Sequence, residues 1–230
     1  MIRIDHLTKT YGRARGITDL TLHVPEGGCF GFIGPNGAGK STTIRTLLGL
    51  LSPTAGSAEV LGLDCVGERK KILAQVGYMP SEAVFYPEMR VGEVIRLSAA
   101  LRKTDCRAQA AALCEALELD TRKRIRELSL GNRKKVSIVC AMQHRPRLYI
   151  LDEPTSGLDP LVQRAFWGEL EARRREGATV FLSSHVLYEV ARYCDRAAIL
   201  REGRLVVEGT TAELDIEDKF FDYYEGRIAQ

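Results

Sequence analysis

Residues 34–41 carry the clearest chemical pattern in the chain. They read Gly-Pro-Asn-Gly-Ala-Gly-Lys-Ser and fit the spacing G-x-x-x-x-G-K-[ST]. Glycines let backbone N–H groups converge on phosphate oxygens, and the positive end of a following helix adds to the attraction. Lys40 would reach the outer phosphates and the Ser41 hydroxyl would hold Mg²⁺. The pattern predicts a triphosphate site; the alternative is a glycine-rich turn with a solvated lysine.

A second cluster of chemical interest lies at residues 148–153. An apolar run, Leu-Tyr-Ile-Leu, leads directly into Asp152 and Glu153. An aspartate at the carboxyl end of a buried strand can help to hold Mg²⁺ beside a phosphate loop. A neighbouring glutamate can polarise an attacking water as a general base. The alternative is a strand end with two solvated acids, which the phosphate loop earlier in the chain disfavours.

The composition is that of an ordinary globular chain. Its 230 residues contain 33 Lys+Arg and 30 Asp+Glu, a net charge of +3 that indicates neither a nucleic-acid binder nor an acidic tail. With 45% apolar and 27% charged residues, the chain is not of the disordered class. No uncharged stretch reaches the ~18 residues that cross a bilayer. Residues 1–24 mix charged with apolar side chains, so we expect no signal peptide.

The cysteines and histidines predict neither disulfides nor a structural metal site. The six cysteines form no C-x-x-C pair, and the four histidines lie far apart in the sequence. We therefore expect reduced, mostly buried thiols in a cytosolic protein.

Strands that alternate with helices are expected to position the two chemical clusters. Residues 29–33 form an apolar run before the phosphate loop, and residues 41–51 read as a helix after it. Further strands are expected at 60–63, 76–79, 148–151 and 179–182, and further helices at 161–175 and 186–194. This alternation predicts an α/β fold with a mainly parallel sheet.

Two other parts of the chain follow different patterns. Residues 2–7 and 20–24 alternate like antiparallel strands, and 197–200 with 205–208 reads as a hairpin. The periodicity is helical over 91–119 and 132–143, which interrupts the strand–helix alternation. We expect a single domain with a core (1–77 and 136–215), an inserted helical subdomain (78–135) and a tail (216–230).

Three further segments complete a family resemblance. They are Leu-Ser-Leu-Gly-Asn at 128–132, Ser-Gly-Leu-Asp at 156–159 and Ser-Ser-His at 183–185. With the phosphate loop and the Asp-Glu pair, the chain resembles the ATP-binding cassette (ABC) ATPases from Tyr11 to His185. The resemblance implies a P-loop NTPase (RecA-like) core with a mainly parallel sheet, an antiparallel β-subdomain and an inserted α-helical subdomain.

The resemblance also implies a role for each matching residue. Tyr11 matches the aromatic residue that stacks on adenine, Asp152 the magnesium-linked acid, Glu153 the catalytic base and His185 the histidine that contacts the γ-phosphate. The loop that holds ATP corresponds to Gly34, Pro35, Asn36, Gly37, Ala38, Gly39, Lys40, Ser41 and Thr42.

A composite, two-subunit site is a further implication. Ser129, Gly131 and Asn132 match the signature that closes over the ATP of the opposite subunit, and Asp159 matches the loop that communicates across the dimer. A serine hydroxyl, backbone amides and a helix N-terminus form an anion site, so the physical chemistry agrees. An isolated monomer is then expected to be a poor ATPase.

The chain departs from the family pattern at two places. The signature has leucine and asparagine where Leu-Ser-Gly-Gly-Gln is usual, and we expect function to survive this change. In the loop after 76–80, Ser81 stands where the family has a glutamine that contacts Mg²⁺ and water. Either Ser81, through a water, or Glu82 is a candidate for that contact.

Two clusters leave alternatives open. The basic residues around the signature could contact nucleic acid or lipid headgroups. The favoured interpretation is that they are solvated charges. They are Arg122, Lys123, Arg124, Arg126, Arg133, Lys134 and Lys135. The aromatic residues of the tail could pack on the core or form a patch for a partner; they are Phe220, Phe221, Tyr223 and Tyr224.

The favoured function is an ATP-binding and ATP-hydrolysing subunit that uses ATP and Mg²⁺ to power transport. The resemblance to bacterial ABC-2-type exporters implies export, a separate membrane-spanning permease and a second nucleotide-binding subunit, with a homodimer expected. It places the chain in the cytoplasm, at the inner face of the membrane, with no nucleic acid as partner. One alternative is a soluble ABC ATPase of translation or DNA repair; another, a P-loop kinase or switch, is disfavoured by the signature.

Overall fold

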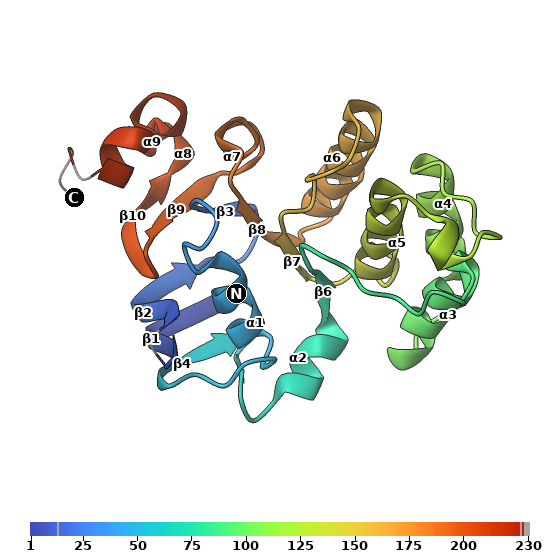
Figure 1. The fold of residues 1–230 in the computed structure, drawn as a ribbon, viewed down its shortest axis with the longest axis horizontal. Helices are drawn as coiled ribbons and strands as arrows, with labels where there is room; N and C mark the ends of the chain where they lie inside the picture. Colours follow the sequence, from blue (N-terminus) through green and yellow to red (C-terminus); the bar gives the residue numbers. More distant parts are fainter. Residues whose placement is uncertain (13, 226, 228–230) are drawn as a thin grey trace.

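The computed structural model describes residues 1–12, 14–225 and 227. In that part of the chain the strands form two sheets, and helices flank the larger one (Figure 1). The larger sheet has six strands in the order β10-β9-β3-β8-β7-β6, and the smaller has four in the order β2-β1-β4-β5. The α/β architecture with a mainly parallel sheet and an antiparallel β-sheet is therefore confirmed.

Parallel strands make up the centre of the six-stranded sheet. Every residue of β3 (Cys29–Ile33), β7 (Leu148–Asp152) and β8 (Thr179–Ser184) is buried, as expected of strands covered on both faces. β6 (Val76–Met79) and β9 (Arg196–Arg201) continue the parallel pairing. Because parallel strands end at one edge, the phosphate loop, the Asp-Glu pair and the histidine all follow strands at that edge.

The four-stranded sheet is antiparallel throughout. It contains β1 (Ile2–Tyr11), β2 (Ala14–Val24), β4 (Ala55–Val60) and β5 (Leu63–Asp64). The prediction of one strand over 60–63 is wrong, because Leu61 and Gly62 have φ values of +59° and +73° and form a two-residue turn between β4 and β5.

The helical segment lies beside β6 and β7 (Figure 1). It contains α3 (Val91–Leu101), α4 (Arg107–Ala116), the 3₁₀ turn η1 (Ile125–Glu127) and α5 (Leu130–Met142). The helical periodicity over 91–119 is interrupted, since Lys103 has a φ of +54° and ends the first helix. Residue 135 falls within α5, and the division into subdomains stays a prediction.

The remaining helices surround the sheet and the C-terminal hairpin. β10 (Arg204–Thr210) forms this hairpin with β9. The helices are α1 (Lys40–Leu47), α2 (Arg69–Gln75), α6 (Pro160–Arg175), α7 (Leu187–Tyr193), α8 (Thr211–Leu214) and α9 (Ile216–Glu225). In α9, Phe220 and Tyr223 pack on the core and Phe221 is exposed; the side chain of Tyr224 lies outside the described residues.

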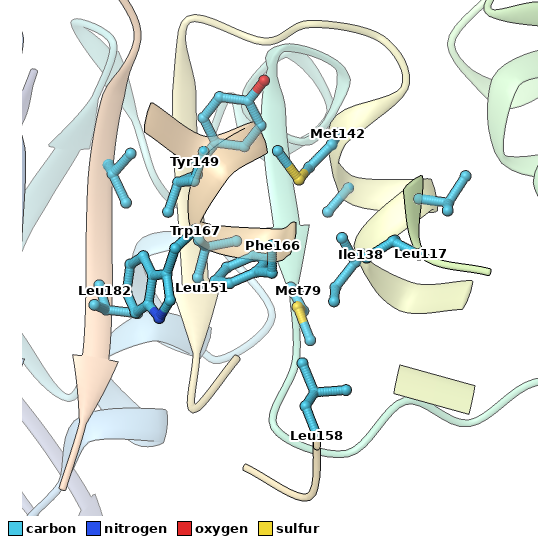
Figure 2. Packing of buried hydrophobic residues seen from close by; sticks show 14 of the residues in the cluster. Met79, Leu117, Ile138, Met142, Tyr149, Leu151, Leu158, Phe166, Trp167 and Leu182 are labelled. Carbon is cyan, nitrogen blue, oxygen red and sulfur yellow. The ribbon is translucent and has the colours of Figure 1, made fainter. Parts of the chain in front are cut away.

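A buried cluster joins α5 and α6 to the six-stranded sheet (Figure 2). Met142 from α5 lies beside Tyr149 of β7 and Ile138 lies beside Met79 of β6, and Phe166 with Trp167 covers the same sheet from α6. The Trp167 ring also stacks on Tyr193 at the end of α7, with ring centroids 3.9 Å apart and planes 10° apart. This packing fixes α6 and α7 to each other and to the sheet.

Neither disulfides nor membrane-spanning helices are found in the described part of the chain. All six cysteines are free thiols, five of them buried and Cys140 partly so. No described helix has the length and apolar character to cross a bilayer.

Candidate active site

The phosphate loop connects the end of β3 to the start of α1. Gly37 and Gly39 have φ values of +83° and +106°, in the left-handed region that favours glycine. At Gly34 an added Cβ would lie 2.6 Å from the Leu200 carbonyl oxygen, so only glycine fits there. Two requirements, one for backbone conformation and one for space, thus explain the glycines of the motif.

Lys40 is the first residue of α1 and is 5% exposed. Its Nζ donates to the carbonyl oxygens of Gly34, at 2.5 Å, and Pro35, at 3.2 Å. The same Nζ lies 3.2 Å from Glu153 Oε1. The structure therefore brings the predicted phosphate-binding lysine into contact with the predicted base.

Glu153 holds a conformation that is uncommon for a residue with a Cβ. Its φ is +50°, and its backbone N–H donates to the Ser183 carbonyl oxygen at 3.1 Å. Its other carboxylate oxygen, Oε2, lies 2.7 Å from His185 Nδ1. The ends of β3, β7 and β8 thus bring Lys40, Glu153 and His185 together, as predicted.

Asp152 shows the features of a residue that holds a cation. It is 1% exposed, and its Oδ1 accepts a hydrogen bond from Ser183 Oγ at 2.5 Å. Its Oδ2 is buried and has no hydrogen-bond partner among the described residues. Mg²⁺ in nucleotide sites uses one or two carboxylates, a hydroxyl, phosphates and water. The buried Oδ2 and the hydroxyl of Ser41, in the first turn of α1, fit that donor set.

Glu189 is a buried acid near the site that the sequence did not single out. This residue of α7 is 6% exposed and accepts hydrogen bonds from Thr155 Oγ1 at 2.9 Å and Ser184 Oγ at 3.2 Å. Burial raises the pKa of its carboxyl group. It joins the segment after Glu153 to the residue before His185. Its position in the helix that is expected directly after His185 is the signal that could have revealed it.

Lys134 is the second functional candidate that sequence reasoning missed. It is 7% exposed and its neighbour Lys135 is 9% exposed, so the expectation of solvated charges is wrong for both residues. The Lys134 Nζ donates to the Glu153 carbonyl oxygen at 2.5 Å and lies 3.5 Å from the Ser81 carbonyl oxygen. Burial lowers the pKa of its ammonium group, against the opposing effect of nearby carboxylates. Nothing in the composition of the basic cluster distinguished it.

The signature residues occupy the start of α5, away from the phosphate loop. Ser129 caps the helix, since its Oγ accepts from the Asn132 N–H at 3.3 Å. Gly131 comes close to the Gly157 carbonyl oxygen, which an added Cβ would approach to 3.1 Å. In the described part of the chain, no hydrogen bond joins these residues to the phosphate loop.

The other predicted residues lie at the margins. Asp159 caps α6 and accepts from the N–H groups of Leu161 and Val162, and Tyr11 ends β1 with 42% of its surface exposed. Ser81 is half-buried and Glu82 is exposed.

Comparison with known proteins now gives the family. The sequence profile described as ABC transporter matches residues 17–156. The chain belongs to the ABC transporter family. It is 37% identical over 219 residues to the uncharacterized ABC transporter ATP-binding protein YhaQ of Bacillus subtilis, covering 93% of this chain and 72% of the relative. It is 36% identical over 214 residues to the bacitracin transport ATP-binding protein BcrA of Bacillus licheniformis, covering 90% of this chain and 69% of the relative.

Solved ABC cassettes share the fold. The structure of an ATP-binding subunit of an ABC transporter superposes with a TM-score of 0.87 at 33% identity, covering 96% of this chain and 93% of that one. A dimeric cassette in a post-hydrolysis state with ADP and phosphate superposes with a TM-score of 0.82 at 23% identity, covering 92% of this chain and 99% of that one. The chain is thus a cassette of this family: an ATP-binding ATPase with a role in transport.

Proposed function

We propose that this cassette binds MgATP at residues 34–42 and hydrolyses it with Glu153 as general base. The contact of the Glu153 carboxylate with both Lys40 and His185 carries this proposal, because it joins a phosphate-binding cation, a base and a second polar group at one strand edge. The chemistry needs these three functions within reach of one phosphoryl group.

Each residue then has a defined part in the reaction. The loop amides and the Lys40 ammonium bind the β- and γ-phosphates. Ser41 and Asp152 would hold Mg²⁺, which would supply charge neutralisation. The Glu153 carboxylate orients a water and accepts its proton as the water oxygen attacks the γ-phosphorus and the bond to the bridging oxygen breaks. His185 Nδ1 steadies the carboxylate and leaves Nε2 to reach the γ-phosphate. Ser81 or Glu82 would assist at the metal, and Tyr11 would stack on the adenine.

A second copy of the cassette completes the proposed site. Ser129, Gly131 and Asn132 make no hydrogen bond to the loop of their own chain, and Leu130 beside them is 68% exposed. Facing the loop of another copy, the start of α5 would bring a hydroxyl and free helical N–H groups to the γ-phosphate. The dimeric state of the solved post-hydrolysis cassette supports this arrangement, with Asp159 near the subunit contact.

The proposed transport partner is a separate membrane-spanning chain. The segment between β6 and α3 presents Val84 and Tyr86, which are 93% and 73% exposed, as apolar groups for a partner. Export is the proposed direction, which the name of another relative, the Nod factor export ATP-binding protein I of Paraburkholderia xenovorans, supports. The inner face of the membrane is the proposed location. In the basic cluster, Arg124 and Arg126 both pair with Glu88, which does not favour nucleic acid as the partner.

The variant Glu153→Gln tests the base. It should retain ATP affinity within about threefold and lose turnover by at least about a hundredfold, since an amide cannot accept the proton. Titration with a fluorescent ATP analogue and phosphate release are the measurements. Glu217→Gln, on the exposed face of α9, is the control. Undiminished hydrolysis by Glu153→Gln would remove Glu153 as the base.

Pull-down from native membranes tests the partner. A multi-span polypeptide should co-purify with the cassette, and recovery should fall when Val84 and Tyr86 are both replaced by serine. Stable association with ribosomes or DNA in place of a membrane chain would favour the alternative role in translation or repair.

A further inference from the structure

Lys134 brings a buried positive charge from the signature helix to the end of β7. It lies in α5, five residues after the cap residue Ser129. Its ammonium group donates to the Glu153 carbonyl oxygen at 2.5 Å, a charge-assisted hydrogen bond. Because the side chain is 7% exposed, water competes little for this contact. The helix that carries the signature therefore touches the backbone of the proposed base directly.

The backbone of Glu153 needs such a contact. With a φ of +50°, the residue adopts the left-handed conformation, which is unfavourable for a side chain with a Cβ. Its N–H is held by the carbonyl oxygen and hydroxyl of Ser183, at 3.1 and 3.2 Å. Its C=O is held by Lys134. Strand β8 thus fixes one side of the residue and helix α5 fixes the other.

The charges around Lys134 are nearly all negative. Burial lowers the pKa of its ammonium group, and the carboxylates of Glu153, Asp152, Glu189 and Glu82 oppose this effect and favour the charged form. Without this ammonium group, the buried Asp152 and Glu189 would lose a nearby compensating charge. Lys134 therefore meets two needs of the site at once, a donor for a carbonyl oxygen and a compensating charge.

We infer that Lys134 is a positioning residue that couples the seating of α5 to the conformation of Glu153. When α5 is seated, the ammonium group holds the left-handed conformation that directs the carboxylate to Lys40 and His185. When α5 rotates away, the Glu153 carbonyl oxygen loses its hydrogen-bond donor. The Glu153 carboxylate is then no longer directed toward Lys40 and His185. The long contact to the Ser81 carbonyl oxygen, at 3.5 Å, brings the loop between β6 and α3 into the same unit. This inference rests on the proposed role of Glu153 as base.

Replacement of Lys134 by methionine tests the inference in the purified protein. Lys134→Met keeps the length and apolar stem of the side chain and removes the donor and the charge. We expect kcat for ATP hydrolysis to fall about tenfold or more, with the KM and the Kd for ATP within about threefold of the parent. Lys134→Arg should recover much of the rate, because it restores a charged donor.

Lys135→Met is the matched control. Lys135 is the next residue and is also buried, at 9% exposed. Among the described residues, the hydrogen bonds to the Glu153 and Ser81 carbonyl oxygens come from Lys134 and not from Lys135. Its replacement should leave kcat within about twofold. A loss of kcat as large as that of Lys134→Met would overturn the inference, because a general weakening of α5 would then account for both. Should Lys134→Met unfold readily, the comparison is made at low temperature with saturating ATP, which stabilises the folded form.

A double variant separates this inference from the proposed function. If Lys134 acts through Glu153, Lys134→Met should not lower the residual rate of Glu153→Gln further. An additional tenfold loss in the double variant would show a separate action and overturn the inference. Normal turnover by Lys134→Met, with Glu153→Gln inactive, would also overturn it and leave the base assignment intact. Normal turnover by Glu153→Gln would instead refute the proposed function itself.

Discussion

At the scale of single residues, the site is built on buried groups whose opposite charges compensate one another. The Lys40 ammonium is almost fully buried and contacts two carbonyl oxygens and the Glu153 carboxylate. Removing one member of a buried ion pair leaves the other uncompensated, which is costly. A bound triphosphate brings negative charge to the same ammonium group, so Lys40 serves both the bound and the free protein.

Lys40→Ala should therefore weaken nucleotide binding itself. We expect the Kd for MgATP to rise about tenfold or more, because the loop keeps its amides but loses its cation. Isothermal titration calorimetry is the measurement. Lys71→Ala, at an exposed surface pair with Glu68, is the control. An unchanged affinity for ATP in Lys40→Ala would count against the phosphate-loop assignment.

His144 makes the stability of the folded chain depend on pH. Burial, with a smaller effect from Arg102, lowers the pKa of its imidazole to about 4, while the unfolded value is about 6.5. Between these values the unfolded chain binds the proton more readily than the folded one. Stability should therefore be complete above pH 6.5 and decline as the pH falls toward 4.

The free energy of unfolding should fall by about 1 kcal/mol between pH 7 and pH 5. This figure already allows for the partial exposure of the His144 ring. Urea unfolding at the two pH values measures it. His144→Gln can still accept a hydrogen bond from Arg102 but does not titrate, so the variant should show a smaller difference between the two pH values. An equal difference in both proteins would exclude His144 as the cause.

At the scale of elements, the caps determine where several helices begin. Asp159 precedes α6, and its Oδ1 accepts from the N–H groups of Leu161, at 3.1 Å, and Val162, at 3.0 Å. Pro160 follows at the first helical position, where its missing N–H costs nothing. The start of α6 is therefore fixed by the same aspartate that the family resemblance places near the subunit contact.

Asp159→Ala should lower the free energy of unfolding by about 1 kcal/mol, because two helical N–H groups lose their acceptor. Urea unfolding monitored by circular dichroism measures the loss. Asp159→Asn, which can still cap, should retain most of the stability. If both variants were equally unstable, the cap would not be the source.

The sequence predicts helices and strands well where a short local pattern is enough to determine them. The strands at 29–33 and 76–79 were predicted to the residue, because short apolar runs end at polar or glycine-rich segments. The strand expected at 60–63 was wrong, because a β-branched valine and two leucines around a glycine do not reveal that Leu61 turns with a positive φ. Helices α2, α8 and α9 were not predicted, since each is short or depends on packing against elements distant in the sequence.

The same limit applies to the site. The spacing of the phosphate loop predicts Lys40, the apolar strand that runs into two acids predicts Glu153, and the family resemblance implies His185. Lys134 could not be predicted, because the sequence shows only one basic residue among several, and its burial results from α5 packing against the end of β7. A residue that contributes to the site through packing between two elements cannot be predicted from the sequence pattern of its own element.

At the scale of the whole molecule, the proposed active site is divided between two copies. Each copy would contribute a phosphate loop to one site and a signature to the other. In a dimer of one copy with a damaged loop and one copy with a damaged signature, both defects would then fall in the same site and leave the other site intact. This property allows the dimer to be tested without a structure of it.

Two inactive variants should restore activity when they are mixed. Lys40→Ala destroys the loop and Ser129→Arg blocks the signature, so each alone is inactive. A mixed dimer keeps one site with an intact loop and an intact signature, and half of the dimers in an equal mixture are mixed. The mixture should therefore regain about a quarter of the parent rate of phosphate release. A mixture as inactive as its components would argue against a composite site.

The stack of Trp167 on Tyr193 gives this molecule a built-in optical reporter. Trp167 is the only tryptophan in the chain, so its intrinsic fluorescence comes from one place, the junction of α6 and α7. Helix α6 follows the segment that contains Asp159, and α7 follows His185. Any shift of α6 against α7 when ATP binds would change the stacking of Trp167 on Tyr193. The emission maximum and intensity of the tryptophan fluorescence would then change. Tryptophan fluorescence would thus detect any relative movement of α6 and α7 on ATP binding without an added label.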